Sequence, residues 1–83
     1  MRELTYVDIL KNKVDTISQY HILDYLKKNL EISEFKIYLI DDDNIKVADK
    51  NDDSLIFTFD KLTKEVSHYE QLLELEIEIE IGL

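Results

Sequence analysis

The sequence predicts an α+β domain, with two short N-terminal helices packed on one face of a four- to five-stranded antiparallel meander. Within residues 1–30, apolar side chains recur at spacings of three and four, which is typical of a helix with one buried face. Residues 34–81 instead contain short runs of β-branched and aromatic residues, separated by turns rich in Asp and Asn. The chain has 83 residues, so we expect a single domain, helical over 1–30 and a sheet over 34–81.

Two helices are expected at about 5–15 and 19–30, because the apolar phase shifts between them. The first stripe is formed by Val7, Leu10, Val14 and Ile17, and the second by Ile22, Leu23, Leu26 and Leu30. Thr5, with Asp8 three residues later, fits a cap for the first helix, and Ser18 is a candidate cap for the second. One kinked helix is the alternative.

The strands are expected where β-forming residues lie between turns, at 35–40, 45–47, 55–59, 65–69 and 72–81. Asp and Asn favour turns because their side chains bond the nearby backbone, so turns are predicted at 41–44, 49–53 and 60–64. The segment 67–73 has a second interpretation, because Ser67 and Glu70 also match a capping box that would begin a helix.

The last predicted strand alternates apolar and acidic residues without a break from Leu73 to Ile81. A strand sends successive side chains to opposite faces, so one face would carry a row of glutamates about 6.6–6.8 Å apart. This row, called the glutamate ladder, consists of Glu74, Glu76, Glu78 and Glu80. The opposite face is expected to bury Leu75, Ile77 and Ile79 against Phe57 and Phe59.

The net charge of −9 is concentrated in the C-terminal two-thirds of the chain. Five basic and four acidic residues give residues 1–30 a net charge of +1, whereas five lysines and fifteen acids give residues 31–83 a net charge of −10. Such a field repels nucleic acid and anionic membranes and attracts a basic protein surface. The simpler interpretation is that the acidic residues keep a small protein soluble.

The acidic residues suggest that the protein mimics a nucleic-acid backbone toward a basic partner, such as a nucleic-acid-binding enzyme. The expected contact residues are the glutamate ladder together with Asp41, Asp42, Asp43, Asp52, Asp53 and Tyr38. In size, acidity and Glu/Asp-rich sheet the chain is similar to small phage-encoded inhibitors, such as the uracil-DNA glycosylase inhibitor and several anti-CRISPR proteins. That resemblance implies a phage or mobile-element inhibitor. A structural or regulatory subunit, or an antitoxin or immunity-type partner, is the alternative, as a monomer or a homodimer.

A divalent-metal-binding domain is a further alternative, because Asp49 to Asp60 partly resembles an EF-hand loop. Asp49, Asn51, Asp53 and Asp60 are the candidate ligands. Ser54 stands where that loop needs glycine, and Asp60 where it needs a bidentate glutamate, so no metal or other cofactor is expected.

Neither a catalytic motif nor a targeting segment is recognisable in the sequence. His21 and His68 have no Ser or Cys nucleophile at a recognisable spacing, so we do not expect an enzyme. Cysteine is absent, and no apolar run is long enough to cross a membrane, which together favour a cytoplasmic protein.

Overall fold

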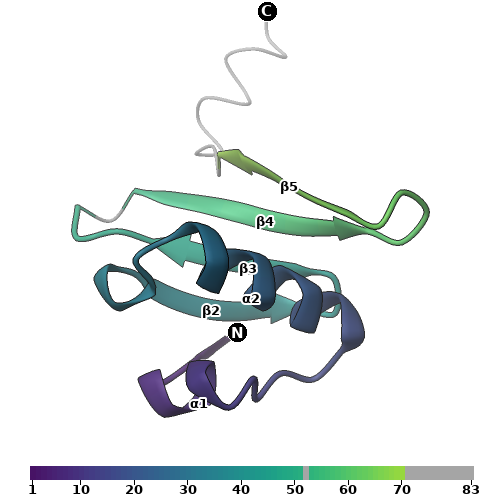
Figure 1. Cartoon of the computed structure of the whole chain (residues 1–83). Helices are drawn as coiled ribbons and strands as arrows, with labels where there is room; N and C mark the ends of the chain where they lie inside the picture. Colours follow the sequence, from purple (N-terminus) through teal and green to yellow (C-terminus); the bar gives the residue numbers. More distant parts are fainter. Residues whose placement is uncertain (52, 71–83) are drawn as a thin grey trace, which may run out of the picture.

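The computed structural model describes residues 1–51 and 53–70, which form an α+β fold (Figure 1). The elements in chain order are β1 (Arg2–Glu3), α1 (Tyr6–Leu10), α2 (Ile17–Asn29), a 3-10 turn (Ile32–Glu34), β2 (Lys36–Asp41), β3 (Asn44–Ala48), β4 (Ser54–Asp60) and β5 (Glu65–Glu70). The five strands lie in one antiparallel sheet in the order β1-β2-β3-β4-β5. The predicted α+β class with an antiparallel sheet is therefore confirmed. Among these residues, no helix has the length and apolar character needed to cross a membrane.

The hairpins from β2 to β5 form where the turn chemistry predicted them. In each turn an aspartate accepts a backbone N–H from two residues later. Asp41 Oδ1 accepts from Asp43 at 2.9 Å, Asp49 Oδ1 from Asn51 at 2.8 Å and Asp60 Oδ1 from Leu62 at 2.8 Å. Each of these bonds lies in the turn between one strand and the next.

One edge strand of the sheet, β1, was not predicted. The two residues of β1 pair with Leu39 and Tyr38 of β2. A strand of two residues is too short to show an alternating pattern in the sequence. The predicted strand at 72–81, with its glutamate ladder and apolar face, lies outside the described residues. Within 67–70 the helical alternative is wrong, because Ser67 and Tyr69 belong to β5 and pair with Thr58 and Ile56.

Both helices begin at a capping box. For α1 the box is the predicted one, since the Thr5 hydroxyl accepts the Asp8 N–H and the Asp8 carboxylate accepts the Thr5 N–H. For α2 the predicted cap Ser18 is wrong. Thr16 caps this helix and Gln19 completes the box, whereas Ser18 is buried in the first turn.

Helix α1 ends at Leu10, five residues short of the prediction, and a separate segment leads to α2, so the single kinked helix is also wrong. Asn12 takes a left-handed conformation with φ of 53°, which asparagine tolerates better than most residues.

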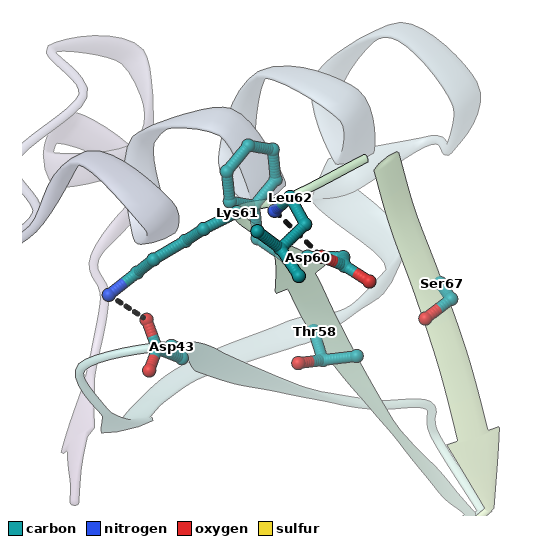
Figure 2. A pocket seen from close by; sticks show the side chains of 7 residues that line it. Asp43, Thr58, Asp60, Lys61, Leu62 and Ser67 are labelled. Carbon is teal, nitrogen blue, oxygen red and sulfur yellow. Dashed lines mark hydrogen bonds and ion pairs between the residues drawn. The ribbon is translucent and has the colours of Figure 1, made fainter. Parts of the chain in front are cut away.

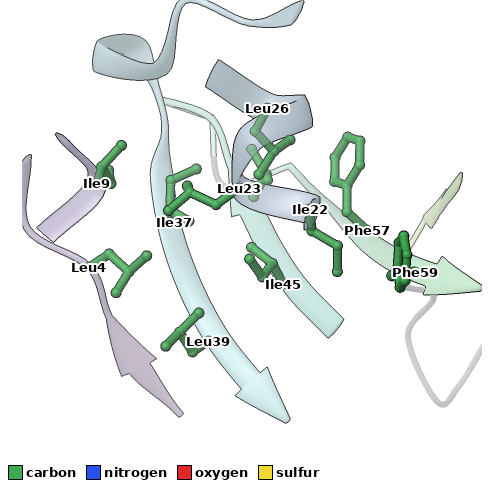
Figure 3. Close-up of a cluster of buried hydrophobic side chains, with 11 residues drawn as sticks. Leu4, Ile9, Ile22, Leu23, Leu26, Ile37, Leu39, Ile45, Phe57 and Phe59 are labelled. Atoms are coloured by element: carbon green, nitrogen blue, oxygen red, sulfur yellow. The ribbon is translucent and has the colours of Figure 1, made fainter. Parts of the chain in front are cut away.

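The core lies between α2 and the sheet (Figure 3). Ile22, Leu23 and Leu26 extend from α2 towards the sheet, as their stripe predicted. They meet Ile37, Leu39, Ile45, Val47, Phe57 and Phe59 from the three central strands, and Leu4 and Ile9 complete the cluster near the chain start. Phe57 and Phe59 are two residues apart in β4, so both side chains lie on the same face of the sheet and contact the helix side.

The first predicted apolar stripe does not form the core. Val7, Leu10 and Ile17 are 53%, 57% and 77% exposed, and Val14 is half-buried. Helix α1 instead contributes Ile9, which is 4% exposed. A five-residue helix has too few turns for a stripe of four residues, and it packs through the side that carries Ile9.

Candidate functional site

The N-terminus of α2 holds the β2–β3 turn in place. The buried Gln19 donates from Nε2 to the carbonyl oxygen of Asp41 at 2.7 Å. Its Oε1 accepts the backbone N–H groups of Asp15 and Thr16 at 2.8 and 3.1 Å. Thr16 Oγ1 donates to the carbonyl oxygen of Asp42 at 2.6 Å. The turn is therefore fixed through its backbone carbonyl oxygens, and the Asp42 carboxylate has no hydrogen bond or ion pair among the described residues.

The β4–β5 turn lies beside the β2–β3 turn. Phe59 donates its backbone N–H to the carbonyl oxygen of Asp43 at 3.4 Å, and Lys61 Nζ lies 3.4 Å from Asp43 Oδ1. Together with the contacts of the α2 N-terminus, these contacts place five carboxylates at the same end of the sheet. We call this group the acidic end; it consists of Asp15, Asp41, Asp42, Asp43 and Asp60.

Only some carboxylates of the acidic end are paired with basic groups. Asn44 Nδ2 donates to both oxygens of Asp41, at 2.8 and 2.9 Å, and this lowers the pKa of Asp41 below its ordinary range, helped by the Asp43 N–H. Arg2 pairs with Asp15, and Lys61 pairs with Asp43. Within the described part of the chain, the other three carboxylates have no basic group within 4.0 Å.

An open pocket of about 430 Å³ lies between the two turns (Figure 2). It is lined by Asp43, Thr58, Phe59, Asp60, Lys61, Leu62 and Ser67. Thr58 and Ser67 are cross-strand partners, so their hydroxyls lie on the same face of the sheet. Asp43 Oδ1 is buried, and its contact with Lys61 lacks hydrogen-bond geometry, so the two form an ion pair only.

The side chains that line the pocket are mostly polar. It offers a carboxylate pair, one ammonium group and two hydroxyls. In the described structure, no imidazole or carboxylate accepts a hydrogen bond from either hydroxyl, so neither is activated as a nucleophile. The lining therefore presents carboxylates, an ammonium group and hydroxyls within one open pocket.

The predicted contact residues do not form one surface. Asp53 lies in the β3–β4 turn, at the opposite end of the sheet from Asp41 to Asp43, and the five residues of β3 separate these turns by about 16 Å. Tyr38 lies on the face away from α2, where Lys46 Nζ sits 5.7 Å from its ring centroid. Asp52 and the four residues of the glutamate ladder lie outside the described residues.

The candidate metal ligands are also separated. Asp49 Oδ1 accepts the N–H groups of Asn51 and Asp53 in the β3–β4 turn, whereas Asp60 lies at the far end of β4. Six residue steps along a strand amount to about 20 Å, so these side chains do not surround one ion. Among residues 1–51 and 53–70, no three metal-binding side chains come together.

We therefore expect millimolar calcium or magnesium to leave the thermal midpoint of unfolding nearly unchanged. A metal present at 100 times its dissociation constant would add about 2.7 kcal/mol of stability, which is several degrees for a chain of this size. Differential scanning fluorimetry with and without calcium measures the shift. A rise of several degrees that Asp49→Ala abolishes would contradict this prediction.

Sequence reasoning missed Asp15, Gln19 and Lys61 as parts of the site and gave Asp60 a different role. Two signals were available. Thr16 and Gln19 match the S/T-x-x-E/Q capping box. The turns of a meander also alternate between the ends of the sheet, so the first and third turns share an end and the second turn does not.

Comparison with known proteins assigns no family, because no family model, curated protein or solved structure matches this chain.

Proposed function

We propose that this is a non-enzymatic binding protein that docks its acidic end against a basic surface of a protein partner. The observation that carries the proposal is the fixed position of the β2–β3 turn, held by Gln19, Thr16 and the β4–β5 turn. A turn that is already ordered loses little conformational entropy on binding, so its charges contribute more to affinity. The separation of the acidic end from the β3–β4 turn confines the contact to one end of the sheet.

In its specific form, the proposal is an inhibitor that occupies the nucleic-acid-binding surface of its target, carried by a phage or mobile element. The net negative charge of the protein supports this form of the proposal. Fourteen acidic and ten basic groups among the described residues give a net charge of −4, and Asp52 with the glutamate ladder brings it to −9. A basic groove that binds phosphates attracts a protein with this negative charge. Free nucleic acid, which is also negatively charged, repels it.

The proposal is tested by reversing charge at the acidic end. Asp15→Lys with Asp42→Lys changes the net charge by four units, and neither carboxylate holds the turns. Against a partner captured from the native host by the wild-type chain, we expect affinity to fall about 100-fold, because like-charge contacts cost several kcal/mol. Titration calorimetry at low salt measures the affinity, and competition with DNA or RNA tests the inhibitor form.

Two control variants carry the same change in charge elsewhere. Glu31→Lys with Asp53→Lys places it at the opposite end of the sheet, and Glu76→Lys with Glu78→Lys places it on the glutamate ladder. We expect both to bind within about threefold of each other and much more tightly than the acidic-end variant. Equal losses in all three would indicate a net-charge effect, and a loss confined to the ladder variant would move the contact there.

A further inference from the structure

The outer edge of β5 presents backbone groups that pair with no strand among the described residues. Strand β5 is last in the order of the sheet and has β4 on its other side (Figure 1). Hydrogen bonding alternates along an antiparallel strand, so every second residue of β5 directs its N–H and carbonyl groups away from β4. A row of such groups is a template for a further strand.

A hydrogen bond of β4 identifies the residues of β5 that point outward. Phe59 donates its N–H to the carbonyl oxygen of Asp43, just before β3, so the backbone of Phe59 bonds on the β3 side. The neighbouring Thr58 then bonds on the β5 side, to its partner Ser67. Tyr69 bonds to β4 in the same way. The N–H groups that point to the free edge are those of Val66, His68 and Glu70.

The outward-pointing residues of β5 also lie on the face of the sheet that carries α2. Val66 and His68 pair with Phe59 and Phe57, and both phenylalanines belong to the core. The Phe57 ring lies 5.2 Å from the His68 ring and 6.2 Å from the Tyr25 ring of α2, measured between centroids. Tyr25 is 38% exposed. The apolar layer under α2 therefore continues to the β5 edge, where an apolar side chain on a neighbouring strand would extend it.

The sequence that follows β5 has the pattern of such a strand. Residues 71–83 lie outside the described residues, and in the sequence apolar residues occupy the odd positions from 73 to 81 and glutamates the even ones. The six residues of β5 span about 20 Å, and seven extended residues span about 24 Å, so this segment is long enough to return along β5 after a loop. Its direct attachment to β5 gives it a millimolar effective concentration at that edge, which favours it over a second copy.

We propose that residues 75–81 form a sixth strand of the sheet, paired antiparallel with β5 and covering its outer edge. An even number of loop residues places the apolar positions opposite Val66 and His68, on the face that carries α2, and the glutamates on the other face. Residues 71 and 72 are Gln and Leu, which do not suit a two-residue loop, so the loop has four residues. Ile77 then lies opposite His68, and Ile79 opposite Val66. This pairing does not rest on the proposed function, because it is measured without a partner.

Hydrogen exchange of the full chain tests the pairing residue by residue. We expect the Val66 and His68 amides to exchange about 100-fold more slowly than unprotected amides. Ile77→Pro removes a ladder hydrogen bond at the centre of the sixth strand, so it should abolish this protection. The amides of Ser67 and Tyr69 bond to β4 and should stay protected, which shows within the same sample that the fold is retained. Gly82→Pro is the matched control, because residue 82 lies beyond the paired segment and its substitution should leave all four amides protected.

A pair of introduced cysteines tests the register. Ser67 and Glu78 would form a non-hydrogen-bonded pair with Cα atoms about 4.5 Å apart, which a disulfide can span. The sequence contains no cysteine, so Ser67→Cys with Glu78→Cys introduces the only thiols. On mild oxidation we expect an intramolecular disulfide to form at least about tenfold faster than in Ser67→Cys with Ile77→Cys, whose side chains lie on opposite faces of the sheet.

Protection of the Val66 and His68 amides that Ile77→Pro abolishes and Gly82→Pro preserves, with the faster disulfide at position 78, supports the proposal. Unprotected Val66 and His68 amides in the wild-type chain overturn it. Protection that survives Ile77→Pro, or that appears only at high protein concentration, also overturns it, because a different strand then covers the edge. Disulfides that form equally fast at positions 77 and 78 overturn the register.

Discussion

Replacing Ile45 with alanine should lower the free energy of unfolding by about 2–5 kcal/mol. Ile45 lies on the central strand β3 and is fully buried against α2 and its neighbouring strands. The change removes methyl and methylene groups from a close-packed site and leaves a cavity that neighbouring strands cannot fill without shifting. A domain of this length has roughly 4–12 kcal/mol of stability in total, so the loss would bring it close to unfolding.

The matched control is the same substitution at Ile17, which is 77% exposed at the first position of α2. We expect Ile17→Ala to change stability by less than about 0.5 kcal/mol, as is usual for exposed positions. Urea denaturation followed by circular dichroism gives both values. A small loss at both positions would contradict the burial of Ile45, and a large loss at both would place Ile17 in an interface.

Residue patterns predicted those elements whose side chains contact the core along their whole length. Along β4, Phe57 and Phe59 alternate with residues on the other face, and in α2 the buried residues Ile22, Leu23 and Leu26 follow the helical spacing. Helix α1 was predicted less well, because Val7 and Leu10 have the spacing of a buried stripe, yet Ile9 is the residue that meets the core. Periodicity gives the spacing of apolar residues. It does not say which face of a short helix packs against the sheet.

The sequence predicted which types of side chain form the candidate site, but not which residues lie together in it. Asp41 and Asp60 were predicted in turns and are the last residues of β2 and β4, where each carboxylate bonds the backbone two residues later, which is a local feature. The contact between Gln19 and the Asp41 carbonyl joins residues 22 positions apart, and no local signal contains it. Such a contact depends on the packing of α2 over the sheet, which a single sequence does not specify.

Gln19 should therefore be the residue on which the acidic end most depends. Gln19→Ala removes an acceptor from the Asp15 and Thr16 N–H groups and a donor from the Asp41 carbonyl. Each buried polar group left without a partner costs about 1–3 kcal/mol, and water can reach some of these, so we expect a total loss of about 2–4 kcal/mol. The same change removes the reciprocal half of the capping box, whereas the bond from the backbone N–H of residue 19 to the Thr16 hydroxyl remains.

Gln19→Glu distinguishes the two halves of this contact. A glutamate still accepts the two N–H groups, but when ionised it cannot donate to the Asp41 carbonyl and repels its oxygen instead. We expect α2 to remain capped while the β2–β3 turn loosens, so the Asp42 amide should exchange with solvent faster and partner affinity should fall. Asn29→Ala is the control, since its amide donates to the Tyr25 carbonyl at an exposed site and its loss should cost well under about 1 kcal/mol.

Hydrogen exchange of the turn amides, with urea denaturation of the same samples, measures both effects. A Gln19→Glu variant with unchanged turn exchange and unchanged partner affinity would show that Thr16 and the β4–β5 turn suffice to hold the acidic end. Faster exchange with weaker binding would instead show that the affinity comes from the fixed position of the carboxylates. In that case the variant, which carries one more negative charge than the wild type, would bind a basic partner less tightly.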